Sequence, residues 1–210
     1  MSKEKTVYIC TNCGYETGKW LGKCPGCDSW GTLEEEVKDV QPAKARFDKG
    51  GKAPKTDSLR KLTDVETVDY TRFSTGSGEF DRVLGGGAVP ASIVLCGGDP
   101  GVGKSTLLLQ TCDFVAKDKD VIYISAEESA HQIKMRAERL GCKGENLYVC
   151  SETDIDDICA LLSVKKPFLA VVDSIQTVYA PYLNSAPGTV SQVRECASRL
   201  MRLAKEDGIT

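Results

Sequence analysis

A glycine-rich segment between residues 98 and 105 has the composition and spacing of a phosphate-binding loop. It reads GDPGVGKS, which matches G-x-x-x-x-G-K-[ST], and it lies between an apolar run and an amphipathic stretch. Glycines let successive backbone N–H groups point at phosphate oxygens, and a helix that begins near Lys104 would add the positive end of its dipole. The alternative is a glycine-rich turn that only joins a strand to a helix. We expect a nucleoside triphosphate and Mg²⁺ to bind here.

Two side chains at the end of this segment have separate roles in such a site. Lys104 supplies a mobile cation for the β- and γ-phosphates, and the Ser105 hydroxyl ligates Mg²⁺. The expected nucleotide contacts are Gly98, Asp99, Pro100, Gly101, Val102, Gly103, Lys104, Ser105 and Thr106.

Acidic residues follow two of the later apolar runs. Asp173 closes the run at 168–172 and is expected to reach Mg²⁺, often through water, because ligands collect at the carboxyl ends of parallel strands. Glu127 and Glu128 follow the run at 121–125, and either could polarise the attacking water. The alternatives are a capping or turn aspartate at 173 and a pair of solvated acids that favour the dipole of the next helix.

Four cysteines near the start form two C-x-x-C pairs separated by ten residues: Cys10, Cys13, Cys24 and Cys27. Four thiolates in this spacing bind Zn²⁺ tetrahedrally at about 2.3 Å. So short a segment cannot build a core, and the metal would supply the free energy of folding, about 10–16 kcal/mol in comparable peptides. A redox dithiol and an iron centre in the same four-sulfur cage are the alternatives.

The two tryptophans and the single histidine are interpreted as structural residues. Trp20 and Trp30 flank the second cysteine pair and are expected to cap the small core there, with stacking on nucleic-acid bases as the alternative. His131, the single histidine, falls on the polar face of a predicted helix and is interpreted as solvated.

The net charge of −3 predicts no general affinity for polyanions, but basic residues concentrate between positions 38 and 61. This segment contains eight lysines or arginines and three aspartates, and we interpret it as a solvated tether, with contact to DNA phosphates as the alternative. No run approaches the ~20 apolar residues of a membrane span. The start, MSKEKTVYIC, lacks an apolar signal segment, so we expect a cytoplasmic protein with no membrane contact.

Apolar runs alternate with amphipathic stretches from about residue 67 onward. The expected strands cover residues 92–97, 121–125, 146–150 and 168–172. The expected helices cover residues 104–117, 130–140, 155–162 and 190–208, with Gly141 and Gly208 as stops. This alternation predicts an α/β fold with a mainly parallel sheet covered by helices on both faces.

Three parts follow from these patterns. We expect a small four-cysteine zinc ribbon at residues 1–35, a flexible basic tether at 36–65 and an α/β domain at 66–210. After Gly208 the chain reads like the start of another strand, so we expect this domain to be incomplete at its C-terminus.

Six motifs occur in this order: CTNC, KWLGKCPGCDSWGTL, TGSGEFDRVLGGG, CGGDPGVGKSTLLLQ, YISAEES and VVDSIQTVY. Together they resemble the bacterial RadA/Sms DNA repair proteins, a RecA-related family, over nearly the whole chain. The resemblance implies a RecA-like P-loop ATPase domain behind a zinc ribbon, with ATP as the nucleotide. Lys104, Ser105 and Asp173 match the family's Walker positions, and Glu127 stands where RecA-like enzymes place the water-activating glutamate.

The resemblance also implies a function and partners. A family member is a DNA-dependent ATPase that acts on single-stranded and branched DNA in recombinational repair, as a hexameric ring beside a recombinase or replicative helicase. Tyr179, Tyr182 and Arg194 would lie near the first DNA-binding loop, with an ordinary loop and helix start as the alternative. The family's KNRFG motif and Lon-protease-like domain lie outside these 210 residues, so we expect a truncated sequence.

A different class of function competes with the enzyme. The ribbon and the P-loop could form a nucleotide-gated adaptor that docks onto a DNA-processing enzyme without useful turnover. A replicative-helicase or clock-type ATPase is a third hypothesis, which the amino-terminal ribbon disfavours. Measuring ATP turnover with and without single-stranded DNA separates the first two.

Overall fold

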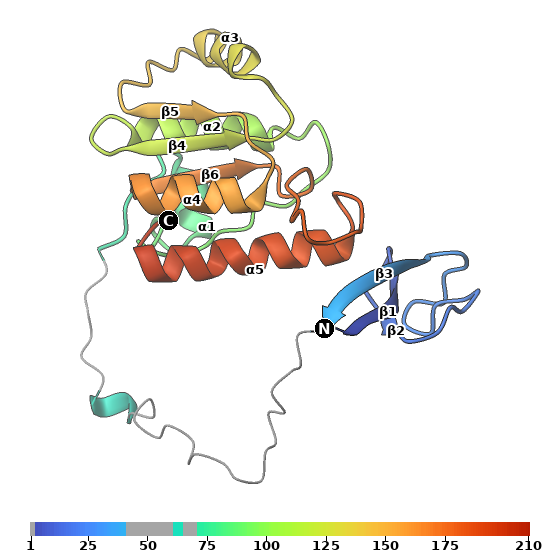
Figure 1. Cartoon of the computed structure of the whole chain (residues 1–210). Coiled ribbons are helices and arrows are strands. Elements are labelled where there is room, and N and C mark those ends of the chain that lie inside the picture. Colours follow the sequence, from blue (N-terminus) through green and yellow to red (C-terminus); the bar gives the residue numbers. More distant parts are fainter. Residues whose placement is uncertain (1–2, 41–60, 65–70) are drawn as a thin grey trace.

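The computed structural model describes residues 3–40, 61–64 and 71–210 (Figure 1). The predicted basic tether at 36–65, and with it any contact to DNA phosphates, therefore falls largely outside the described residues. Of that segment the structure describes the end of a strand up to Val40 and a short 3₁₀ turn at Leu62–Asp64.

The four-cysteine segment folds as a small antiparallel sheet. Its strands are β1 (Lys3–Cys10), β2 (Glu16–Thr17) and β3 (Leu33–Val40), in the order β2-β1-β3. The register pairs Cys10 with Leu33 and Lys3 with Val40. The sheet thus continues beyond the predicted ribbon boundary at residue 35, because β1 pairs with β3 as far as Val40.

The larger part contains a parallel sheet. Its strands are β4 (Val121–Ser125), β5 (Leu147–Cys150) and β6 (Leu169–Asp173), in the order β5-β4-β6. All five residues of the central strand β4 are buried, as expected for a strand covered on both faces. The register aligns Ser125 with Asp173, so the residues that follow β4 and β6 meet at one edge of the sheet.

Five helices are found in the described part of the chain: α1 (Gly78–Val83), α2 (Lys104–Val115), α3 (Ala130–Leu140), α4 (Ile155–Lys165) and α5 (Val190–Asp207). Helices α2 and α3 pack on one face of the sheet, around Val121 and Tyr123. Helices α4 and α5 pack on the other face, around Ile122 and Ile124 (Figure 1). Alternate residues of β4 therefore enter two separate cores, which confirms the predicted α/β class.

Helix ends follow the local chemistry of the sequence. Ser129 begins α3 with a reciprocal capping box to Gln132. Gly141 and Gly208 follow α3 and α5 at φ values of 73° and 72°, where a side chain would be strained. The predicted stops of both helices are confirmed.

The strand predicted at residues 92–97 is not formed. Ile93, Val94 and Leu95 are 50%, 42% and 86% exposed, and the one backbone hydrogen bond found for this segment in the described part of the chain is the turn bond from Ser92 N to Val89 O. Thr210 occupies the start of the adjacent edge of β6, where its N–H donates to Phe168 O and its carbonyl accepts from Ala170 N. The prediction was wrong because an apolar run indicates burial, whereas a strand also needs a neighbouring strand to pair its N–H and C=O groups.

None of the helices in the described part of the chain is both long and apolar enough to cross a membrane.

Candidate nucleotide and zinc sites

The glycine-rich segment forms a loop that ends at the first residue of α2. Gly101 and Gly103 adopt φ values of 82° and 98°, which residues with a Cβ rarely adopt. A Cβ built at either position would meet no atom within 4 Å, so these glycines are needed for backbone conformation rather than for lack of space. The space beside the loop is open to a ligand.

The N-terminus of α2 differs from those of α3 and α4. Gly103 caps α2 without a side-chain hydrogen bond, and the first turn contains no acidic residue. By contrast, Ser129 and Asp154 cap α3 and α4 with their side chains. The first N–H groups of α2 therefore lack a side-chain acceptor and keep the positive end of the helix dipole unopposed, which suits a phosphate.

Lys104 bridges the loop from within. Its Nζ donates to Gly98 O at 2.7 Å and to Asp99 O at 2.8 Å. An ammonium has three donors, so one remains for a phosphate oxygen. Ser105 and Thr106 follow in the first turn of α2 and are half-buried. The Ser105 hydroxyl and the Asp173 carboxylate offer oxygen donors of the kind that Mg²⁺ prefers. The residues present fit a magnesium–nucleotide ligand.

Two acids from different strands come together at the sheet edge. Asp173 ends β6, and its Oδ2 accepts a hydrogen bond from the Tyr123 hydroxyl rather than from a helix amide. Glu127 lies exposed in the loop after β4, where its Oε1 accepts from Ser174 Oγ at 2.6 Å. Glu127 is therefore adjacent to the residue that follows Asp173.

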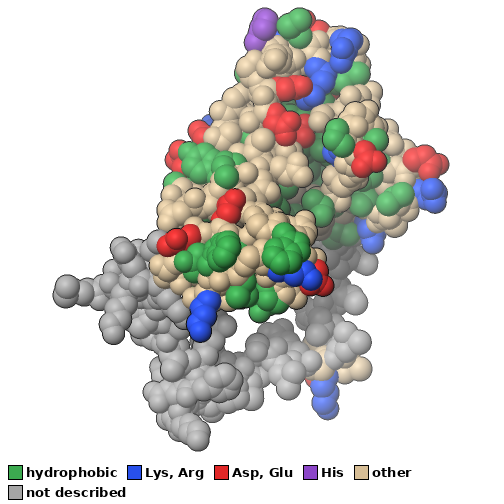
Figure 2. Space-filling model, turned by 90° about the vertical axis from the view of Figure 1, so that its right-hand side faces the viewer, with side chains coloured by type: hydrophobic (Ala, Val, Ile, Leu, Met, Phe, Trp, Pro, Cys, Tyr) green, Lys and Arg blue, Asp and Glu red, His purple; other side chains and the backbone are tan. Residues whose placement is uncertain are grey.

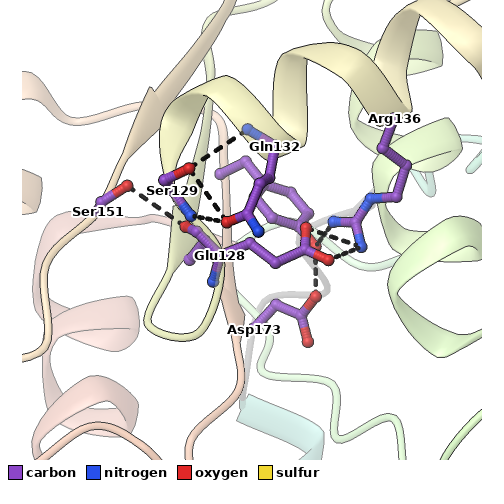
Figure 3. Close-up of polar contacts among 8 residues, drawn as sticks. Glu128, Ser129, Gln132, Arg136, Ser151 and Asp173 are labelled. Atoms are coloured by element: carbon purple, nitrogen blue, oxygen red, sulfur yellow. Dashed lines mark hydrogen bonds and ion pairs between the residues drawn. The ribbon is translucent and has the colours of Figure 1, made fainter.

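Glu128 has a different environment from Glu127. Its carboxylate lies 3.1 Å from the guanidinium of Arg136, whose side chain is only 13% exposed (Figure 3). This ion pair engages Glu128, whereas no ion pair to Glu127 is found among the described residues. Of the two glutamates that the sequence offered, Glu127 is the more exposed and has no ion pair within the described residues.

Sequence reasoning missed three residues of this site: Tyr123, Arg136 and Ser174. A signal for Tyr123 existed, because a phenolic hydroxyl in the middle of a buried strand requires a hydrogen-bond partner. Its partner Asp173 lies fifty positions away, so the contact becomes visible only once β4 and β6 are known to be neighbours.

The segment after β6 is ordered by one buried amide. Gln192 is 1% exposed; its Oε1 accepts from Ala180 N at 2.7 Å and its Nε2 donates to Ser185 O at 2.8 Å. Sequence reasoning missed this residue as well, and a glutamine on an amphipathic helix gives no signal of burial.

The three candidate DNA contacts lie in or beside this segment. Tyr182 is 52% exposed and donates its hydroxyl proton to Glu195 at 2.6 Å, and Arg194 is exposed on α5. Tyr179 is half-buried, and its backbone pairs with Thr153 and Ile155. Tyr182 and Arg194 therefore remain accessible, whereas Tyr179 is anchored by its backbone.

The four predicted zinc ligands converge. The Sγ atoms of Cys10, Cys13, Cys24 and Cys27 all lie within 4.8 Å of one another, with Cys10–Cys27 at 3.6 Å and Cys13–Cys24 at 3.5 Å. A tetrahedron with Zn–S bonds of about 2.3 Å has sulfurs about 3.8 Å apart. The cage therefore fits Zn²⁺ in both its donor set and its dimensions.

Electrostatics in the cage also favour a cation. Hydrogen bonds from Ser29 and Asn12 lower the pKa of the Cys27 thiol to about 6. Despite a hydrogen bond from the Tyr15 backbone, burial and the neighbouring sulfurs raise the pKa of Cys13 to about 12. Close thiolates repel one another, and a divalent metal removes that repulsion.

The two tryptophans of the ribbon do not cap its core. Trp20 is 62% exposed and Trp30 is 76% exposed, and atoms of both rings lie within 3.8 Å of the position of a Cβ on Gly22. The predicted capping role is wrong because the buried cluster of the described ribbon is formed by Cys10, Cys24 and Leu33, packed against Tyr8, Cys13 and Cys27, and neither indole belongs to it. Figure 2 views the molecule from the side on which the ribbon lies in Figure 1, and exposed hydrophobic side chains are visible there among charged ones. His131 is exposed on α3, as predicted.

Comparisons with known proteins agree with both sites. Residues 8–35 match the family model described as a rubredoxin metal binding domain, and residues 73–161 match the KaiC ATPase model. The chain is 49% identical over 210 residues to the DNA repair protein RadA of Bacillus subtilis (strain 168), which covers 100% of this chain and 46% of that protein. The chain is thus similar over its whole length to about half of this RadA protein.

Two further RadA proteins show the same extent of similarity. The DNA repair protein RadA of Halalkalibacterium halodurans is 48% identical over 212 residues, covering 100% of this chain and 46% of the relative. The protein of the same name from Listeria monocytogenes serovar 1/2a is 46% identical over 209 residues, covering 99% of this chain and 45% of the relative. The resemblance predicted from the motifs is confirmed, and the chain spans about half the length of these relatives.

Proposed function

We propose that this chain binds ATP with Mg²⁺ at residues 98–106 and hydrolyses it in the service of DNA repair. The single observation that supports this most is the start of α2 at Lys104, which has no side-chain cap and no acidic residue in its first turn. Glu127 adds to it, because its carboxylate is hydrogen-bonded to Ser174, the residue after Asp173. The RadA names of the relatives support the link to DNA repair.

Each residue has a distinct part in the proposed reaction. Loop amides and Lys104 bind the phosphates and stabilise the charge that develops on the γ-phosphoryl oxygens. Ser105 and Asp173 would hold Mg²⁺, which neutralises phosphate charge when bound. Glu127 orients a water molecule and accepts its proton as the water oxygen bonds to the γ-phosphorus and the bond to the ADP oxygen breaks.

The proposed DNA substrate is single-stranded or branched. Tyr182 and Arg194 offer an exposed aromatic ring and a cation beside the nucleotide domain, and Trp20 with Trp30 offers two exposed indole faces on the ribbon. Aromatic faces stack on bases without sequence preference, and cations bind the backbone. The resemblance to RadA further supports a cytoplasmic hexameric ring that works beside a recombinase or a replicative helicase.

The experiment compares steady-state ATP turnover of the zinc-loaded chain with and without single-stranded DNA, and Lys104→Ala is the inactive reference. We expect turnover in the wild type, an increase with DNA, and loss of both in Lys104→Ala. Lys134→Ala is the matched control, because Lys134 is exposed on α3 and pairs only weakly with Glu138. Equal turnover in the wild type and Lys104→Ala would remove the enzyme hypothesis.

The adaptor remains the second candidate function. One observation favours it: residues 92–97, which precede the P-loop, do not form a strand of the described sheet. DNA binding that depends on nucleotide while turnover is absent would support the adaptor over the enzyme.

A further inference from the structure

A chain of partly buried polar groups joins Asp173 to helix α3 (Figure 3). The Tyr123 hydroxyl donates to Asp173 Oδ2 and accepts a 3.1 Å hydrogen bond from Arg136 Nη2. Arg136 Nη1 in turn lies 3.1 Å from the Glu128 carboxylate. The network thus connects β4, β6, α3 and the loop that contains Glu127.

On the basis of the ATP site proposed above, we propose that Tyr123 is a positioning residue for the magnesium-binding carboxylate of Asp173. Arg136 and Glu128 fix the orientation of the Tyr123 hydroxyl. As a consequence, one carboxylate oxygen of Asp173 is hydrogen-bonded to Tyr123, and the other would be left to hold Mg²⁺.

The direction of each hydrogen bond follows from the donors available. A guanidinium only donates, so the Tyr123 oxygen must accept from Arg136, and its single proton is left for Asp173. Oδ1 of Asp173 accepts no hydrogen bond from any residue that the structure describes, and this leaves it available for Mg²⁺ or a magnesium-bound water.

The network is poorly suited to a purely stabilising role. The Arg136 side chain is only 13% exposed, and its Nε is buried without a hydrogen-bond partner in the described part of the chain. The Glu128 side chain is 38% exposed, and an ion pair that is half open to water and leaves one donor unsatisfied contributes little net stability, so orientation explains it better. The position supports this explanation, because Glu128 adjoins Glu127 and Asp173 adjoins Ser174, and Glu127 and Ser174 are hydrogen-bonded to each other.

The experiment measures binding of a fluorescent, non-hydrolysable ATP analogue to the whole chain while Mg²⁺ is titrated. We expect Tyr123→Phe to raise the Mg²⁺ concentration for half-maximal binding about 10-fold, the lower end of the loss seen when a partner of a metal ligand is removed. Binding in EDTA should not change, and saturating Mg²⁺ should restore full binding. Tyr148→Phe is the matched control, because Tyr148 lies on the neighbouring strand β5 and is 57% exposed.

The outcomes separate this inference from the proposed function. A wild type without magnesium-dependent binding would contradict the ATP site itself, and the inference with it. Magnesium-dependent binding in the wild type with an identical curve for Tyr123→Phe would overturn the inference alone. If Tyr123→Phe does not fold, the double variant Glu128→Gln/Arg136→Met takes its place, because it removes the ion pair without changing the net charge. An unchanged dependence of analogue binding on Mg²⁺ in this double variant would overturn the inference equally.

Discussion

The ribbon and the nucleotide domain hold their sites together by different means. The buried centre of the ribbon consists of Cys10, Cys24 and Leu33, and two of these three are metal ligands. The nucleotide domain places nine buried residues on each face of its described sheet, and the phosphate loop adds none of them. Zinc binding would therefore supply much of the folding free energy of the ribbon, whereas the proposed ATP site lies beside cores that form without the ligand.

The largest expected effect is the removal of zinc. Chelation, or Cys24→Ser, should unfold residues 3–40, because metal binding supplies about 10–16 kcal/mol in small zinc domains. Amide hydrogen exchange checks this, with protection lost in β1 and β3 and retained in β4. Cys142→Ser is the control, a half-buried cysteine outside the cage. Protection of β1 in the metal-free chain would contradict the stated difference between the two regions.

The next effect concerns the core of the nucleotide domain. Leu109 is fully buried on α2, so Leu109→Ala should lower the free energy of unfolding of this domain by about 2–5 kcal/mol. Zinc content of the same variant should stay at one per chain. Urea unfolding measures the first quantity and metal analysis the second, with exposed Gln110→Ala as the control. Loss of zinc in Leu109→Ala would mean that the two regions fold as one unit.

The third effect separates the two glutamates after β4. Glu127→Gln should lower ATP turnover about 100-fold or more, the usual contribution of a general base, while magnesium–ATP binding is retained. Glu128→Gln should lower turnover much less, because Glu128 is engaged with Arg136. Single-turnover kinetics at saturating Mg²⁺ compare the two variants. A larger loss in Glu128→Gln would reverse the assignment.

The smallest effect on folding is expected at the exposed indoles. Trp20→Ala and Trp30→Ala should change the stability of the zinc-loaded ribbon by no more than about 0.5 kcal/mol, as is usual for surface positions. Each should weaken binding of single-stranded DNA by about 1 kcal/mol, the low end of the stacking contribution. Fluorescence anisotropy of labelled DNA measures this. Loss of zinc together with unfolding of the ribbon in either variant would mean that the indoles do cap its core, despite the exposure of both rings.

Local features of this molecule could be predicted from the sequence, because short-range chemistry decides them. The P-loop, the four cysteines and the helix stops at Gly141 and Gly208 all depend on a few neighbouring residues. The contact between Tyr123 and Asp173 could not be predicted, because it requires knowing that β4 and β6 are adjacent.

The two incorrect predictions share a physical cause. The apolar run at 92–97 was assigned to the sheet, and Trp20 and Trp30 were assigned to a core, from hydrophobicity alone. A hydrophobic side chain favours burial away from water, but burial also requires another surface to pack against. The described sheet offers residues 92–97 no paired neighbour, and the ribbon is too small to cover an indole.

Calorimetric titration of magnesium–ATP into the folded, zinc-loaded chain tests the central claim most directly. Binding of one nucleotide per chain is expected, and Lys104→Ala should weaken it about 100-fold, since hydrogen bonds to charged groups contribute about 1.5–3 kcal/mol. The heat should also depend on Mg²⁺. No heat from the folded wild type, or equal affinity in Lys104→Ala, would contradict the assignment of residues 98–106 as the triphosphate site.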